Sequence, residues 1–316
     1  MRFYDIFNGD ADGICALHQL RLAEPQPGTL VTGVKRDIRL LERVPAQAGD
    51  MLTVLDINLR DNLPALDAAL ERGARCVWFD HHAAGEVPRH PNFEPHIETG
   101  SEVCTSLLVD RHLRGLHRAW AVVGAFGDNL TTAAQSAAVP LGLHASDVQR
   151  LRELGQAINY NAYGETEGDL HYPPAELYLA LSRYPNPLEF ITGEPIFDAL
   201  RGACFDDLAL ADDLSAHLET PRCAAYILPD SAWARRVNGE FANRLARENP
   251  GRAHAVLVQT AGGYRVSVRA PLERPRGADV LCSRFETGGG RTGAGGINHL
   301  PESDLERFLR EFAGAF

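Results

Sequence analysis

Short apolar segments alternate with amphipathic segments over the first 80 residues, and this alternation restricts the fold more than any other feature of the sequence. The apolar segments, which we interpret as strands, are residues 3–7, 30–34, 51–55 and 75–79. Residues 12–22 and 61–71 place apolar side chains at helical spacing, on one face. Strands that alternate with helices predict a mainly parallel sheet covered by helices.

The pattern further along the chain predicts two α/β domains. Helical spacing is clearest at residues 101–114, 118–126, 146–160 and 195–220. Strands return after Pro221, and 316 residues are enough for two domains of ~100–200 residues each. We expect a first domain over residues 1–195, a connecting helix over 196–221 and a smaller domain over 222–316.

Charge is divided unevenly between the two parts of the chain, whose formal net charge is −11. Residues 221–316 hold 14 Arg and 10 acidic residues, a net of +4. Residues 1–220 hold 17 basic and 32 acidic residues, a net of −15. Proteins that coat long duplex nucleic acid present a basic surface, so the acidic first part argues against that class. A short anionic substrate remains compatible with these charges.

The cysteines and the N-terminal residues predict a cytoplasmic protein. None of the six cysteines lies in a CxxC pair and several lie in apolar segments, so we expect buried, reduced thiols rather than a zinc site. No apolar run approaches the ~18 residues that span a bilayer. Acidic residues near the N-terminus, where a signal peptide has its apolar stretch, argue against secretion.

Acidic and imidazole side chains follow three of the predicted strands directly where each strand ends. They are Asp10 and Asp12 after the first strand, Asp56 after the third, and Asp80, His81 and His82 after the fourth. The carboxyl ends of parallel strands share one edge of a sheet, so these groups should converge there. Converging carboxylates need a counter-charge, which a pair of divalent cations such as Mn²⁺ or Mg²⁺ supplies. Each acid by itself is equally typical of a helix or turn cap, but together they predict metal-assisted phosphoester hydrolysis.

Six ordered motifs resemble those of the DHH phosphoesterases and of their DHHA1 substrate-binding domain. The motifs are Asn8-Gly9-Asp10-Ala11-Asp12-Gly13, Val54-Leu55-Asp56, Asp80-His81-His82, Gly124-Ala125-Phe126-Gly127-Asp128, Ser267-Val268-Arg269 and the glycine-rich segment from Gly288 to Gly296. The resemblance covers nearly the whole chain, and residues 130–220 support it least. It implies a DHH domain with a mainly parallel sheet flanked by helices, followed by a smaller α/β DHHA1 domain.

The resemblance also implies an activity. The family includes RecJ-type single-strand exonucleases, nanoRNases, 3′-phosphoadenosine 5′-phosphate phosphatases and cyclic-dinucleotide phosphodiesterases, which use two Mn²⁺ ions between their domains. A hydrolase of short oligonucleotides or linear dinucleotides, acting through a two-metal-activated hydroxide, is the function we expect. The alternatives are a 3′-phosphoadenosine 5′-phosphate phosphatase, a single-strand exonuclease and a nucleotide-binding protein with weak catalysis. Mg²⁺ in place of Mn²⁺ and assembly as a homodimer both stay open.

Carried over by position, the resemblance assigns metal ligands and catalytic residues. One ion would be held by Asp10 and Asp56, and the other by Asp12, Asp56, His81 and Asp128, so that Asp56 bridges the two. His82 would face the substrate phosphate, and Asp80 would orient an imidazole. The catalytic candidates are therefore Asp56, Asp80 and His82.

The same resemblance assigns substrate binding to the second domain. The guanidinium groups of Arg269 and Arg291 would bind phosphate through forked hydrogen bonds. The backbone N–H groups of Gly288, Gly289 and Gly290 would approach an anion closely. Ser101, at the start of a predicted helix, is interpreted either as a helix cap or as a phosphate contact.

Two positions depart from the family pattern. Many members have His two or four residues before the first Asp of the first motif, where this chain has Asn8 and Ile6. Either one ion loses an imidazole ligand, or Asn8 ligates it through the amide oxygen. The usual His of the glycine motif is Arg291, which does not titrate near neutral pH, so we expect Arg291 to bind phosphate rather than donate a proton.

Overall fold

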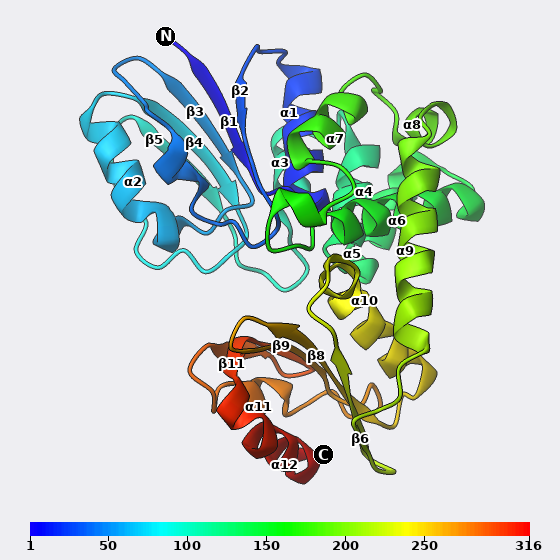
Figure 1. Cartoon of the computed structure of the whole chain (residues 1–316). Coiled ribbons are helices and arrows are strands. Elements are labelled where there is room, and N and C mark those ends of the chain that lie inside the picture. Colours follow the sequence, from blue (N-terminus) through cyan, green and yellow to red (C-terminus); the bar gives the residue numbers. More distant parts are fainter. The chain divides into compact units, whose positions relative to one another are not determined.

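Three neighbouring parallel strands bring their carboxyl ends to one edge of the N-terminal sheet. The computed structural model describes residues 1–316, and the first sheet has the order β2-β1-β3-β4-β5, with every pair parallel (Figure 1). Its strands are β1 (Phe3–Phe7), β2 (Thr29–Val31), β3 (Met51–Leu55), β4 (Arg75–Asp80) and β5 (Phe93–Ile97). Phe7 pairs with Leu55, and Leu55 with Phe79, so the residues that follow these strands start level with one another.

The α/β fold class predicted from the sequence is confirmed, and β1 and β3 have the predicted bounds. The strand predicted over residues 30–34 is shorter, since β2 ends at Val31. We did not predict β5, whose sequence is Phe-Glu-Pro-His-Ile. Pro95 cannot donate a ladder hydrogen bond, and β5 tolerates it because the strand lies at the edge of the sheet.

Helices cover both faces of this sheet (Figure 1). The helices that precede α9 (Ile196–Asp212) are α1 (Ala11–Ala23), α2 (Leu59–Glu71), α3 (Thr105–His112), α4 (Arg118–Gly127), α5 (Thr131–Ala138), α6 (Ala145–Asn161), α7 (Pro174–Leu181) and α8 (Pro187–Gly193). Leu66 of α2 belongs to the core on one face, with Val54 and Trp78 of the sheet. On the other face, α1, α3, α4 and α6 share a second core that contains Phe7 and Phe79. Short 3₁₀ helices lie at Leu40–Arg43, Val139–Leu141, Glu167–Asp169 and Glu302–Asp304.

Two predicted helices have different bounds in the structure. The helix predicted over residues 101–114 is α3, which begins at Thr105, and Ser101 lies exposed in the turn before it. Cys104 is the N-cap residue of α3, so Ser101 does not cap this helix. The helix predicted over residues 195–220 is α9 (Ile196–Asp212), which is followed by strand β6 (Leu218–Glu219).

Two glycines of the fourth motif allow α1, α3 and α4 to pack closely. A Cβ atom at Gly124 would lie 2.2 Å from Ser106 Oγ, and one at Gly127 would lie 2.3 Å from Ala11 Cβ. Both distances are far shorter than van der Waals contact, so a larger residue would push the helices apart. The close packing fixes the end of α4, where Asp128 is the C-cap residue.

The chain divides into two units, Met1–Gly202 and Ala203–Phe316, and the second unit has a six-stranded mixed sheet. The strand order is β10-β11-β9-β8-β7-β6. Its remaining elements are β7 (Cys223–Leu228), α10 (Ala232–Glu248), β8 (Ala253–Thr260), β9 (Gly263–Arg269), α11 (Ala278–Cys282), β10 (Gly288–Arg291), β11 (Ala294–Pro301) and α12 (Leu305–Ala315). The glycine-rich segment thus forms the edge strand β10, the hairpin turn and the start of β11, although the sequence analysis predicts no strand there.

The two faces of this second sheet pack against different helices. Val266 and Val268 of β9 share a core with Phe308 and Phe312 of α12. On β7, Ala225 points into that core, so the neighbouring Tyr226 points to the opposite face. Its ring lies 5.5 Å from that of Phe241, which places α10 on the opposite face.

The cysteines are all free thiols, and five of the six are buried. Burial raises the pKa of the Cys76 thiol well above its usual range. The prediction of buried, reduced cysteines therefore holds for every one except Cys204, which is half-buried. None of the helices has the combination of length and hydrophobicity that crossing a lipid bilayer requires.

The buried His18 of α1 gives the protein a pH-dependent stability. Its Nε2 lies 2.9 Å from the carbonyl oxygen of Tyr184, and its ring lies against that of Trp120. Burial lowers the pKa of His18 to about 4. The unfolded chain therefore binds more protons than the folded chain between pH 6.5 and 4, and the free energy of unfolding falls as the pH falls through that range.

We predict that His18→Gln, which keeps a side-chain donor for Tyr184 but does not titrate, reduces this pH dependence. Between pH 7 and pH 5 the wild type should lose about 2 kcal/mol more stability than the variant. Urea unfolding at both pH values measures the difference. His254 of the second unit also has a pKa of about 4 and is unchanged in the variant, so some pH dependence should remain. Equal losses in the two proteins would contradict the prediction.

Candidate metal and phosphate site

Asp56 lies directly after β3 in a backbone conformation that few residues adopt. Its φ is 58°, in the left-handed region, where Asp and Asn are the most tolerated residues after glycine. The backbone N–H of Asp56 donates to Phe79 O at 3.0 Å, which ties the turn to β4. Thr105 Oγ1 donates to Asp56 Oδ1 at 3.1 Å. Non-glycine residues held in this conformation are often found at functional sites.

The start of α3 holds the carboxylate of Asp12. The backbone N–H of Thr105 donates to Asp12 Oδ2 and that of Ser106 to Asp12 Oδ1, both at 2.7 Å. Ser106 Oγ also donates to the backbone carbonyl of Asp12 at 2.7 Å. First-turn N–H groups have no partner within their own helix and favour a negative charge. Asp12 is therefore fixed in position although its side chain is only 1 % exposed.

His81 lies at the centre of a group of carboxylates. Its Nε2 is 3.4 Å from Asp56 Oδ1, 3.9 Å from Asp128 Oδ2 and 4.0 Å from Asp12 Oδ2. The ligand atoms of Asp56, His81 and His82 all lie within 4.8 Å of one another. We call Asp12, Asp56, His81 and Asp128 the His81 cluster. The family resemblance implies that these four residues are the ligands of one metal ion. In the structure they lie close together, although three of them follow different strands and the fourth is at the end of α4.

His82 is oriented by the fully buried Asp80. His82 Nδ1 lies 2.7 Å from Asp80 Oδ1, and the side chain of His82 is 43 % exposed. Burial disfavours the charged imidazole, but the hydrogen bond to Asp80 and the nearby acids outweigh it and raise the pKa of His82. With Nδ1 engaged by Asp80, the nitrogen that remains for another group is Nε2. The raised pKa favours the imidazolium form, in which Nε2 carries a proton and can donate to an anion.

The electrostatics of the His81 cluster fit a divalent cation. Burial and the neighbouring charges of Asp10, Asp12, Asp128 and Asp80 raise the pKa of Asp56 well above its usual range. Burial, with the charges of Asp12 and Asp10, raises the pKa of Asp128 to about 6. These carboxylates repel one another, and a bound cation would remove the repulsion. Carboxylate oxygens with one imidazole nitrogen are the donor set that suits Mn²⁺ or Mg²⁺.

Comparison with solved structures identifies the fold. The structure of RecJ from Thermus thermophilus in complex with Mn²⁺ matches with a TM-score of 0.59 at 15 % identity, over 99 % of this chain and 51 % of that one. The pGpG-specific phosphodiesterase PggH from Vibrio cholerae matches with a TM-score of 0.56 at 12 % identity, over the full length of both chains. The chain has the fold of the DHH phosphoesterases.

A further match is an exopolyphosphatase-related protein from Bacteroides fragilis, with a TM-score of 0.54 at 15 % identity over 99 % of this chain and 91 % of that one. This chain thus spans about half the length of Thermus thermophilus RecJ but nearly the whole length of the other two proteins. No family model and no curated protein matches the sequence. The predicted DHH resemblance is confirmed in the fold, with Asp56, His81 and His82 at the candidate metal site.

In the first DHH motif, Asp10 has the helix-capping role that was one of its two predicted interpretations, together with an ion pair that the sequence did not reveal. Asp10 caps α1, and its Oδ1 accepts from the backbone N–H groups of Asp12 and Gly13. Its other oxygen forms an ion pair with Lys35. Asn8 Oδ1 accepts from the N–H of Asp10 at 3.2 Å. Lys35, Thr105 and Ser106 are the site residues that sequence reasoning missed.

The two predicted phosphate-binding arginines lie on the same face of the second sheet. Arg291 of β10 and Arg269 of β9 both pair with Ala294 of β11, so their side chains project to one side. Two strand spacings of ~4.8 Å separate their backbones. Arg269 Nε donates to Asn243 Oδ1 at 2.6 Å, whereas Arg291 is exposed. The predicted glycines Gly288, Gly289 and Gly290 form β10 beside β11.

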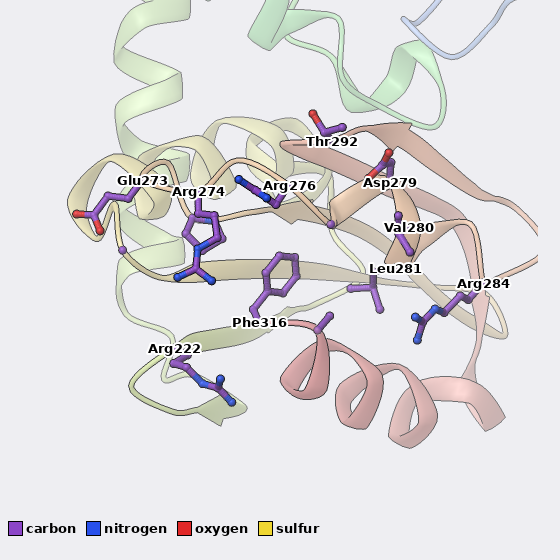
Figure 2. Close-up of a pocket in the computed structure, with 14 residues that line it drawn as sticks. Arg222, Glu273, Arg274, Arg276, Asp279, Val280, Leu281, Arg284, Thr292 and Phe316 are labelled. Atoms are coloured by element: carbon purple, nitrogen blue, oxygen red, sulfur yellow. The ribbon is translucent and has the colours of Figure 1, made fainter.

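A pocket of about 840 Å³ lies elsewhere in the second unit (Figure 2). Arg222, Arg274, Arg276 and Arg284 line it together with the ring of Phe316 and acidic residues. None of the predicted phosphate-binding residues lines this pocket. Ser101 lies exposed in the first unit and is not a member of the His81 cluster.

We predict that Thr105→Ala weakens Mn²⁺ binding by ~10–100-fold, because the hydroxyl that orients Asp56 is lost. Thr105→Ser keeps the hydroxyl and is the matched control, so its affinity should stay close to that of the wild type. Calorimetric titration with Mn²⁺ measures both. The same affinity in the alanine variant would show that the Thr105 hydroxyl does not position the ligand.

Proposed function

We propose that the protein is a metal-dependent phosphoesterase that hydrolyses the phosphodiester bond of short nucleotides, with a linear dinucleotide or short oligonucleotide as substrate. The observation that carries the proposal is the His81 cluster, in which three carboxylates surround one imidazole nitrogen within 4.0 Å. A divalent cation held there supplies a Lewis acid and the positive charge that a reacting phosphate requires. The Mn²⁺ and Mg²⁺ in the Thermus thermophilus RecJ structures support these ions as the cofactor.

The protein's own residues have distinct tasks in this proposal. Asp12, Asp56, Asp128 and His81 hold the cation. Asp80 fixes the ring of His82, and in the imidazolium form the Nε2–H of His82 donates to a phosphate oxygen and stabilises the charge that develops during the reaction. We assign catalysis to a DHH domain over residues 1–195 and substrate binding to a DHHA1 domain over residues 222–316, with residues 196–221 connecting them.

Three observations support a short nucleotide as the substrate class. The chain matches a pGpG-specific phosphodiesterase over the full length of both proteins, and pGpG is a linear dinucleotide. The first unit is acidic, which disfavours a long polyanion. Arg269 and Arg291 project from one face of the second sheet, where their guanidinium groups can bind phosphate.

The direct test is turnover of a 5′-pNpN dinucleotide such as pGpG with Mn²⁺. We expect release of mononucleotides that stops when EDTA is added and returns with excess Mn²⁺. 3′-Phosphoadenosine 5′-phosphate, polyphosphate and single strands of two to about ten nucleotides serve as comparison substrates. Absence of mononucleotide release from every dinucleotide, over a range of pH, would refute the proposal.

We predict that Asp56→Asn reduces this activity to background, since the change removes a charged ligand from the His81 cluster. Asn tolerates the left-handed backbone at this position, whereas Ala would add strain and confuse loss of ligand with loss of folding. Asp67→Ala, which removes an exposed acid from α2, is the control and should retain full activity. Near-normal turnover by the Asp56 variant would exclude Asp56 as an essential ligand.

Arg291→Ala should raise the KM for the dinucleotide by ~10–100-fold with a smaller effect on kcat, because hydrogen bonds to charged groups contribute ~1.5–3 kcal/mol. Arg291 is exposed, so folding should be unaffected. Arg310→Ala removes an equally exposed charge from α12 and serves as the matched control. If both variants keep the wild-type KM, Arg291 does not bind substrate.

A further inference from the structure

Lys35 is held at the candidate metal site by contacts with two separate segments, the start of α1 and the end of α6. It follows β2, and its backbone N–H donates to Ala162 O at 2.9 Å, at the end of α6. Its Nζ forms an ion pair with Asp10 and donates to Asn159 Oδ1 at 3.1 Å. Nζ also lies 5.6 Å from the centre of the Tyr163 ring, within range of a cation–π interaction. The ammonium group therefore has a defined position.

The carboxylate of Asp10 accepts from three donors within the protein. One oxygen accepts two backbone N–H groups of α1, and the other is paired with Lys35. Burial alone would raise the pKa of Asp10, but the charge of Lys35 outweighs it and lowers the pKa. Asp10 and Lys35 thus form a charged pair that is neutral as a whole. A divalent ion at Asp10 would have to displace the ammonium group.

The residues around Asp10 provide few further ligands for a metal ion. Ile6 is apolar and fully buried. Asn8 uses its amide oxygen for the N–H of Asp10 and its amide nitrogen for Lys35 O, at 3.2 Å each. By contrast, the His81 cluster offers three carboxylates and one imidazole. The two candidate ion positions are therefore unequal in the number and charge of their ligands.

We propose that the Lys35 ammonium group takes the place of a second metal ion at Asp10, so that the chain binds one divalent cation, in the His81 cluster. An ammonium group is a compact point charge with three donors, so it can neutralise the Asp10 carboxylate as a cation would. Lys35 is the one lysine in a chain that has arginine at its 30 other basic positions, 31 in all. The inference rests on the proposed metal-dependent function.

The metal content of the wild-type protein tests the inference directly. After equilibration with Mn²⁺ and removal of free ion, we expect one Mn²⁺ per chain, and an electron paramagnetic resonance spectrum without exchange coupling between two ions. Two bound ions per chain, or a coupled spectrum, would overturn the inference and leave the proposed function intact. Failure to bind any Mn²⁺ would overturn both, so the two failures are distinguishable.

Variants of Lys35 provide the second arm. Lys35→Met removes the charge at similar side-chain length and leaves Asp10 without its counter-charge, so we expect a second Mn²⁺ ion to bind at saturating concentration, more weakly than the first because Asp10 has few neighbouring ligands. Lys35→Arg keeps the charge and serves as the control for charge alone, with one ion expected. Circular dichroism checks that both variants fold. A folded Lys35→Met protein that still binds one ion would contradict the proposal.

A third measurement uses the wild-type protein and does not depend on the folding of any variant. Because the chain has one lysine, uniform labelling with ¹⁵N-lysine gives a single side-chain ammonium signal in an NMR spectrum. The signal should be protected from solvent exchange and should persist at saturating Mg²⁺, which is diamagnetic. Loss of the signal on addition of Mg²⁺ would show that the ion displaces Lys35 from Asp10.

Discussion

Repulsion between buried carboxylates at one edge of a parallel sheet is the constraint on which the first unit depends. Asp10, Asp12 and Asp56 are each almost completely buried there, and each is stabilised by a donor that lies far from it in the sequence. The first turn of α3 donates to Asp12, the Thr105 hydroxyl to Asp56, and the Lys35 ammonium to Asp10. These donors come from segments far apart in the sequence. The site therefore forms only when α1, α3 and the loop after β2 are all in place.

The parts of the fold that the sequence predicts are those in which local pattern and burial agree. β1 and β3 lie inside the sheet and are covered on both faces, so apart from Asp5 and Thr53 they consist of apolar residues and have clear ends. The acids that follow them are conspicuous because they interrupt those runs. The level register of Phe7, Leu55 and Phe79 then brings the acids together, as expected for parallel strands.

Other parts depend on tertiary contacts that leave little trace in the sequence. β5 contains proline and charged residues, and β10 consists mainly of glycine, so neither has strand propensity, and both form at sheet edges. In the sequence, Thr105 and Ser106 are typical of the start of any helix. Their hydrogen bonds to Asp12 depend on the packing of α3 against α1, which the sequence does not show. The only unusual feature of Lys35 in the sequence is that it is the one lysine among the basic residues. Its contact with Asn159 could not be predicted, because Asn159 lies 124 residues away.

The hairpin that joins β10 to β11 limits how the second unit can vary. Arg291 and Ala294 form the last pair, so the turn has two residues, Thr292 and Gly293. Adding or removing one residue would shift β10 by one position and move the Arg291 side chain to the opposite face from Arg269. Insertions in this turn are therefore less tolerable than its exposed position suggests. The turn itself contains no predicted site residue. Its length nevertheless determines whether the guanidinium groups of Arg269 and Arg291 lie on the same face and can bind one substrate together.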